Sequence, residues 1–303
     1  MAKEPPPPSV SEAVKELLAD STERIRLDDF VTHHLKRTLA ALSLTHFPPS
    51  VPFSDEALLA RLKAYEEATL DLMIIVVLIA RWGGAEHLAT LENIFSRMAE
   101  ADKGSAGTTL WLRLGWHPVH ILVYAAGISA IAAKNYELLA PTLLTPVHTE
   151  HRTNGMPDVP LVVRVFEEMS QIDDVFKKIP GHDRDRVPRS EYLYGLLRQP
   201  LEAEFFLGKS YENLFDRFEV IAALVYADLT FQERGRIWGP IGRFGWKHSR
   251  GGENNPFSHV IAQARAQGAS WPMLHAGFFH GQQDRFDEID KGFAELMGKL
   301  NWW

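Results

Sequence analysis

The sequence predicts an all-α protein, and three features support this prediction. Two runs, residues 72–80 and 121–133, are apolar all around a helix, so each must be wrapped by neighbouring helices or lie in lipid. Each run is shorter than the roughly 20 residues that a bilayer requires. The other segments have helical hydrophobic periods, and no stretch alternates as a strand does. We therefore expect a multi-helix body, either a two-lobed helical bundle or a degenerate helical-repeat array.

Composition limits the classes of site and partner. The chain of 303 residues carries 39 acidic against 32 basic residues, a formal charge of −7, so any polyanion site must be a local patch. It has no cysteine, which excludes disulfides, thiol nucleophiles and cysteine-bound zinc. Nothing in the composition requires an oxidising compartment, and the expected localisation is cytoplasmic.

The first expected lobe covers residues 9–146 and follows a proline-rich tail at 1–8. Four consecutive prolines without an apolar core make this tail an extended polyproline segment. Ser9 and Glu12 form a capping box at the first helix, and Ser54 caps the longest one. The helices expected in this lobe span 10–19, 27–42, 54–81, 85–101 and 118–134.

The second expected lobe covers residues 147–303. Residues 145–160 contain prolines, glycine and polar residues without periodicity, which marks a boundary between lobes. We expect Ser210 to cap a helix, and Trp302 and Trp303 to dock onto the body. The helices expected here span 161–176, 190–198, 210–229, 256–267 and 282–300.

One arrangement of residues suggests metal chemistry. The adjacent His182 and Asp183 have the ligand order of all-helical HD-type metal phosphohydrolases, with His148 or His151 upstream and Asp228 downstream completing the set. Such a site holds a divalent metal that activates water for attack on phosphate. The pair should lie on a helix, whereas this one lies in a loop between two prolines. A phosphohydrolase using His151, His182, Asp183 and Asp228 is therefore an alternative hypothesis.

Three weaker motifs have structural explanations. His117 and His120 are three residues apart, and such a pair ligates metal only with further ligands, so we interpret them as core or surface histidines. Lys209 lies in a Gly-Lys-Ser triplet that resembles the end of a phosphate-binding loop, but the first glycine and the preceding strand are missing. Gly127 and Ser129 lie within an apolar helix, where small residues permit close packing.

Segment 233–252 differs most from its surroundings. It has five cationic residues against one acid and interleaves them with three aromatic residues. In an acidic protein, this is a patch suited to phosphates, single-stranded nucleic acid or an acidic partner. The alternative is a connector whose tryptophans pack on the helices and whose arginines pair with carboxylates. The binding residues predicted here are Arg234, Arg236, Trp238, Arg243, Trp246, Lys247 and Arg250.

Several stretches resemble the helical carboxyl-terminal regions of bacterial multidomain proteins. They are LVYAAGISAIAAKNYELLAPTLL, YENLFDRFEVIAALVYADL, GRIWGPIGRFGWK and MLHAGFFHG with FAELMGKLNWW. In those proteins a Sir2-like or AlbA-type putative DNA-binding effector domain precedes the helices. The resemblance covers most of residues 25–303. It implies a regulatory, sensing or oligomerising module in phage defence and transfers no catalytic residue.

The predicted function is a non-catalytic helical module for protein interaction, sensing or oligomerisation, with bacterial antiviral defence as its setting. We expect a protein partner or self-association, no membrane contact, and no catalytic residue, metal or cofactor. Binding of nucleic acid or a phosphate ligand through residues 233–252 is one alternative, and the metal-dependent phosphohydrolase is the other.

Overall fold

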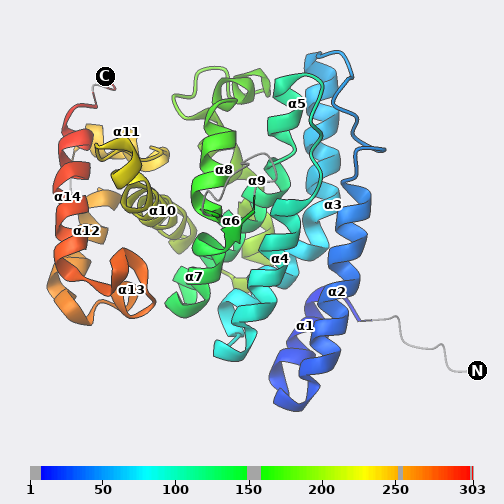
Figure 1. Ribbon diagram of the computed structural model, residues 1–303, viewed down its shortest axis with the longest axis horizontal. Helices are drawn as coiled ribbons and strands as arrows, with labels where there is room; N and C mark the ends of the chain where they lie inside the picture. Colours follow the sequence, from blue (N-terminus) through cyan, green and yellow to red (C-terminus); the bar gives the residue numbers. More distant parts are fainter. Residues whose placement is uncertain (1–7, 149–157, 252–254, 301, 303) are drawn as a thin grey trace, which may run out of the picture.

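The computed structural model describes residues 8–148, 158–251, 255–300 and 302, and this part of the chain is all-α apart from one small pair of strands (Figure 1). The helices before residue 148 are α1 (Val10–Ala19), α2 (Arg24–Ala41), α3 (Asp55–Trp82), α4 (Leu88–Glu100), α5 (Thr109–Leu114), α6 (His117–Ala133) and α7 (Tyr136–Leu144). The later helices are α8 (Leu161–Ser170), α9 (Pro188–Phe205), α10 (Ser210–Arg234), α11 (Arg243–Arg250), α12 (Pro256–Gln267), α13 (Pro272–His275) and α14 (Gln283–Gly298). Short 3₁₀ turns are η1 (Ser21–Glu23), η2 (Ala85–His87), η3 (Asp173–Lys178), η4 (Gly268–Ser270) and η5 (Phe278–Gly281).

α6 is the buried centre of the fold. Every residue from His117 to Ile131 is buried, because α3, α7, α8, α9 and α10 surround this helix (Figure 1). Thr109–Ala133 is long and apolar enough to cross a membrane, and 89% of its most apolar 18-residue window is buried inside the protein. Packing against other helices thus accounts for the apolar composition of this segment, and the predicted all-α fold is confirmed.

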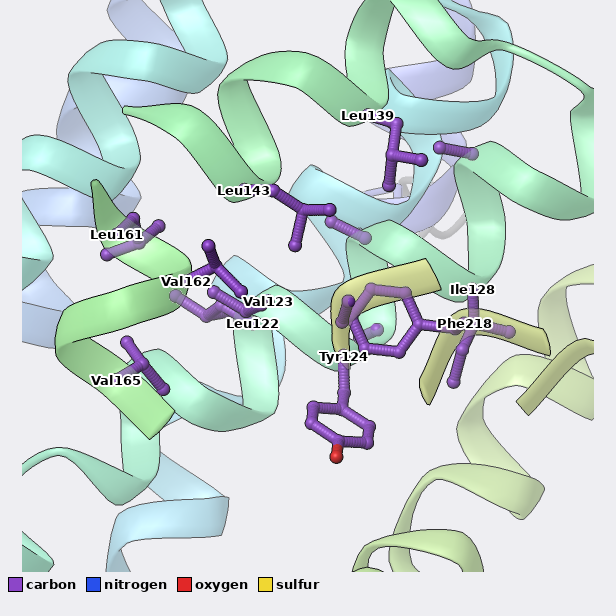
Figure 2. Close-up of a cluster of buried hydrophobic side chains, with 14 of the residues drawn as sticks. Leu122, Val123, Tyr124, Ile128, Leu139, Leu143, Leu161, Val162, Val165 and Phe218 are labelled. Carbon is purple, nitrogen blue, oxygen red and sulfur yellow. The ribbon is translucent and has the colours of Figure 1, made fainter. Parts of the chain in front are cut away.

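Two small residues let α6 approach its neighbours closely. A Cβ atom on Gly127 would lie 2.0 Å from the ring of Phe218 on α10. On the other side, the Ser129 hydroxyl donates a 2.7 Å hydrogen bond to the carbonyl oxygen of Val77 on α3. Figure 2 shows the Phe218 ring beside Tyr124, whose hydroxyl points away from the aliphatic side chains. The predicted packing role of Gly127 and Ser129 is confirmed.

Most predicted helix starts are present in the structure, whereas the helices predicted at 161–176, 190–198 and 210–229 end at Ser170, Phe205 and Arg234. Ser9 and Glu12 form the expected capping box of α1, and the Ser54 side chain accepts a hydrogen bond at the start of α3. The predicted cap at Ser210 is wrong. Lys209 occupies the cap position of α10 without a side-chain hydrogen bond, and Ser210 is the first helical residue.

A small sheet lies at the predicted boundary between lobes. β1 (Pro146–Val147) pairs antiparallel with β2 (Val159–Pro160), which the sequence did not predict because two-residue strands have no readable alternation. The sheet therefore joins the two sides of the boundary placed at residue 147. α10 also contacts α6 and α8 as well as α12 and α14 (Figure 1). The two-lobe division stays a prediction.

Candidate functional site

α11 lies within the segment that was predicted to bind a ligand, and two of its cations face inward. Lys247 Nζ lies 2.5 Å from Glu212 Oε1 of α10 and also contacts the Asp216 carboxylate. The Arg243 side chain is only 6% exposed, and its guanidinium carbon lies 3.5 Å from the ring centroid of Tyr194 on α9. Arg243 and Lys247 thus attach α11 to α9 and α10, as the connector interpretation expects.

A buried carboxylate, Glu219 of α10, lies beneath the start of α11. It accepts hydrogen bonds from Ser190 Oγ at 2.6 Å, Tyr124 Oη at 3.1 Å and the Arg243 backbone N–H at 2.8 Å. Burial raises the pKa of Glu219 to about 7, although the Ser190 hydrogen bond opposes this shift. The cavity beside this cluster holds about 10 Å³, roughly the space of one water. The cluster therefore ties α6, α9, α10 and α11 together and has no room for a substrate.

The Glu219 carboxyl makes stability depend on pH. Because its pKa is about 7 in the folded chain against an ordinary value of 4.5, the folded state binds more protons between these values. The resulting stabilisation is present below pH 4.5 and is lost as the pH rises through 7. We expect Glu219→Gln to abolish this loss of up to about 3 kcal/mol, measured by urea unfolding at several pH values. Parallel profiles for the variant and the parent chain would contradict this assignment.

The first part of the predicted segment precedes α11 and contacts other helices. Arg234 donates to Glu167 at 3.0 Å and to the Tyr226 hydroxyl at 2.8 Å, and its guanidinium carbon lies 5.4 Å from the Trp238 ring centroid. Arg236 is exposed and forms no ion pair with the described residues. Arg234 and Trp238 therefore pack this connection against α8 and α10.

The described members of the proposed metal set each have a different environment. His182 Nδ1 lies 2.6 Å from Asp185 in the loop before α9, and Asp183 is exposed. Asp228 Oδ1 lies 2.5 Å from an arginine Nε of α14. Across the described parts of the chain, no group of three or more His, Asp or Glu residues could hold a metal ion. His151 lies outside the described residues.

The other histidine pair belongs to the core. His117 and His120 are both 0% exposed, so of the two predicted environments, core or surface, both residues have the core one. His120 Nε2 lies 3.0 Å from an Arg189 nitrogen. Burial, and secondly the charge of Arg189, lowers the pKa of His120 well below its ordinary value. His148, the other upstream candidate, lies on the surface 3.0 Å from Asp158.

Two adjoining hollows flank Trp246 and Arg250 on the outer side of α11, and we call them together the α11 groove. The α10 hollow, of about 550 Å³, lies between α10, α11 and α12. The α9 hollow, also of about 550 Å³, lies between α11, Glu191 of α9 and the loop before α9. Trp302 lines the α9 hollow, and a Cβ atom on Gly245 of α11 would lie 2.6 Å from its ring, so its predicted docking is confirmed. Trp303 lies outside the described residues.

The α11 groove has unpaired positive charge. All four carboxylates that line it already have partners: Glu212 and Asp216 pair with Lys247, Asp185 pairs with His182, and Glu191 accepts a 2.9 Å hydrogen bond from Trp246 Nε1. Four cations that line the groove form no ion pair with any described residue: Arg186, Lys209, Arg217 and Arg250. The Arg250 guanidinium carbon lies 4.6 Å from the Trp246 ring centroid. Such cations attract an anion from solvent.

The groove brings together residues that the sequence analysis had kept apart. Trp246 and Arg250 belong to the predicted segment, whereas Arg186, Lys209 and Arg217 come from before α9 and from α10. Lys209 had been noted only for the Gly-Lys-Ser triplet. The chain matches no protein-family model, no curated protein and no solved structure. The functional argument therefore depends on the α11 groove.

Proposed function

We propose that the chain is a non-catalytic binding module that holds an anionic ligand in the α11 groove. One observation carries this proposal: the carboxylates of the groove are already paired, whereas Arg186, Lys209, Arg217 and Arg250 are not. A ligand that brings negative charge satisfies these cations without breaking an existing ion pair. The module would serve a sensing or interaction role in the cytoplasm, and the setting in antiviral defence depends on the resemblance alone.

The ion pairs that Arg243 and Lys247 form inside the protein support a ligand-binding function for α11 rather than a catalytic one. Arg243 and Lys247 fix the helix on α9 and α10, so Trp246 and Arg250 are presented on a rigid element. A rigid element lowers the entropic cost of ligand binding. The polar cluster around Glu219, which has the strongly shifted pKa that often marks a catalytic group, is enclosed.

Titration calorimetry with tripolyphosphate tests this proposal on the whole chain. We expect binding at roughly 50 mM NaCl that weakens severalfold at roughly 300 mM NaCl, because salt screens exposed charges. Arg250→Gln should weaken binding about tenfold, the effect of losing one charge-assisted hydrogen bond. Arg236→Gln is the matched control, because Arg236 is exposed, unpaired among the described residues and outside the groove. Equal affinities for the two variants would refute the groove as the binding site.

Self-association is a second candidate function, supported by exposed aromatic residues where α3 and α9 end. Phe206 is 90% exposed with a φ of 49°, a costly conformation for a bulky residue, and Trp82 is 61% exposed. The Arg81 guanidinium carbon lies 4.9 Å from the Trp82 ring centroid and 4.4 Å from that of Phe205, the residue before Phe206, so one guanidinium group contacts the ends of both helices. We propose a second copy of the chain as the occupant. Light scattering should report a dimer that Phe206→Ser dissociates, and a monomeric parent chain would exclude it.

A further inference from the structure

We propose that the ligand of the α11 groove is a nucleoside phosphate, with its base in the α9 hollow and its phosphates in the α10 hollow. This inference rests on the proposed function, because it names the ligand class of the same groove. It follows from the described side chains that line the two hollows: both have cations, but the α9 hollow has two indoles and the α10 hollow has one.

The α9 hollow has the chemistry of a base site. The indoles of Trp246 and Trp302 line it together with the guanidinium groups of Arg184 and Arg186. Indole and guanidinium planes both stack on the π face that every nucleobase has. Glu191 adds acceptor oxygens: Oε1 takes the Trp246 hydrogen bond, and a carboxylate has further lone pairs for the exocyclic amino group of a base.

The α10 hollow has the chemistry of a phosphate site. Lys209, Arg217 and Arg250 line it, and within the described chain Trp246 is its one indole. Arg217 Nη2 donates a 3.2 Å hydrogen bond to the Tyr136 hydroxyl, which restrains the position of its guanidinium group. Lys209 is the cap residue of α10, so the amino end of this 25-residue helix adds a partial positive charge to the same hollow.

The two hollows meet at Trp246 and Arg250, which line both. Arg250 stacks over Trp246 at the junction, so one guanidinium group is close to both the expected base and the expected phosphate. Each hollow of about 550 Å³ lies within the usual size range of ligand pockets. A free nucleotide and a nucleotide of a single strand offer the same base and phosphate chemistry.

The test compares the affinities of ATP, tripolyphosphate and an oligodeoxyadenylate of about 12 nucleotides for the whole chain, without added divalent cations. We expect ATP to bind about tenfold more tightly than tripolyphosphate, because one stacked base adds about this factor. Trp246→Leu should remove this advantage, so that ATP and tripolyphosphate bind the variant with affinities within about twofold of each other. Trp246→Phe should retain most of the advantage, because a phenyl ring also stacks.

The outcomes separate this inference from the proposed function. If ATP and tripolyphosphate bind the parent chain equally, or if Trp246→Leu weakens both equally, the base site is wrong while the anion groove stands. If none of the three probes binds, the proposed function itself fails. An oligodeoxyadenylate that binds more than about tenfold tighter than ATP supports a single strand as the source, and any weaker binding of the oligonucleotide supports a free nucleotide.

Discussion

Replacing Gly127 by valine should lower the free energy of unfolding by on the order of 3 kcal/mol or prevent folding. Even the first added carbon would lie 2.0 Å from the Phe218 ring, so α6 and α10 must move apart. Gly127 is buried in α6, and Phe218 lies in the core (Figure 2), where packing is too dense to absorb such a shift. Urea unfolding of the purified variant measures the effect.

A matched control is available on α9. Gly195 is exposed within the helix, and a Cβ atom there would meet nothing within 4 Å. Gly195→Ala should therefore leave the free energy of unfolding unchanged or raise it by up to about 1 kcal/mol, because alanine favours helix. If Gly127→Val and Gly195→Ala have similar stabilities, the central position of α6 in this account is wrong.

Replacing Arg243 by methionine should destabilise the chain by on the order of 3 kcal/mol. Arg243 is 6% exposed between Glu191, Asp216 and the Tyr194 ring, so the substitution leaves buried negative charge without one of its partners. Burial raises the pKa of Asp216, whereas Lys247 and Arg243 lower it. Because the loss of Arg243 costs most where the Asp216 carboxyl is ionised, we expect a larger decrease in the free energy of unfolding at pH 8 than at pH 4. Urea unfolding at both pH values measures it.

Arg250→Met is the counterpart of this variant on the outer side of α11. Arg250 is exposed and has no ion pair among the described residues, so its loss should change stability by less than about 0.5 kcal/mol. Arg243 would then have a structural role and Arg250 a binding role, although the sequence placed both in one patch. Equal destabilisation by the two substitutions would remove this distinction.

The sequence predicted the helices where the signal is local. Ser9, Glu12 and Ser54 mark real helix starts, and the apolar runs of α3 and α6 are buried as expected. Where the other elements form depends on tertiary contacts. α11 begins at Arg243, and its many polar and small residues did not indicate a helix in the sequence. Ion pairs with α9 and α10 stabilise this helix in the fold. The two-residue strands are likewise set by contact rather than by pattern.

The candidate site was predictable only in part. Composition alone pointed to Trp246 and Arg250, but it could not separate them from Arg243 and Lys247, whose partners lie on other helices. Arg186, Lys209 and Arg217 come from other segments, and only the fold brings them to the same groove. Glu219 was missed, and the one available signal was an acid directly before the apolar run 220–227.

The account depends most on the claim that an anion binds at α11. Hydrogen–deuterium exchange of the whole chain with and without tripolyphosphate tests this claim and locates the site. We expect slower exchange in α11, from Arg243 to Arg250, and in the first turn of α10, with little change in α1 and α2. Unchanged exchange in α11 under conditions where calorimetry reports binding would contradict the account.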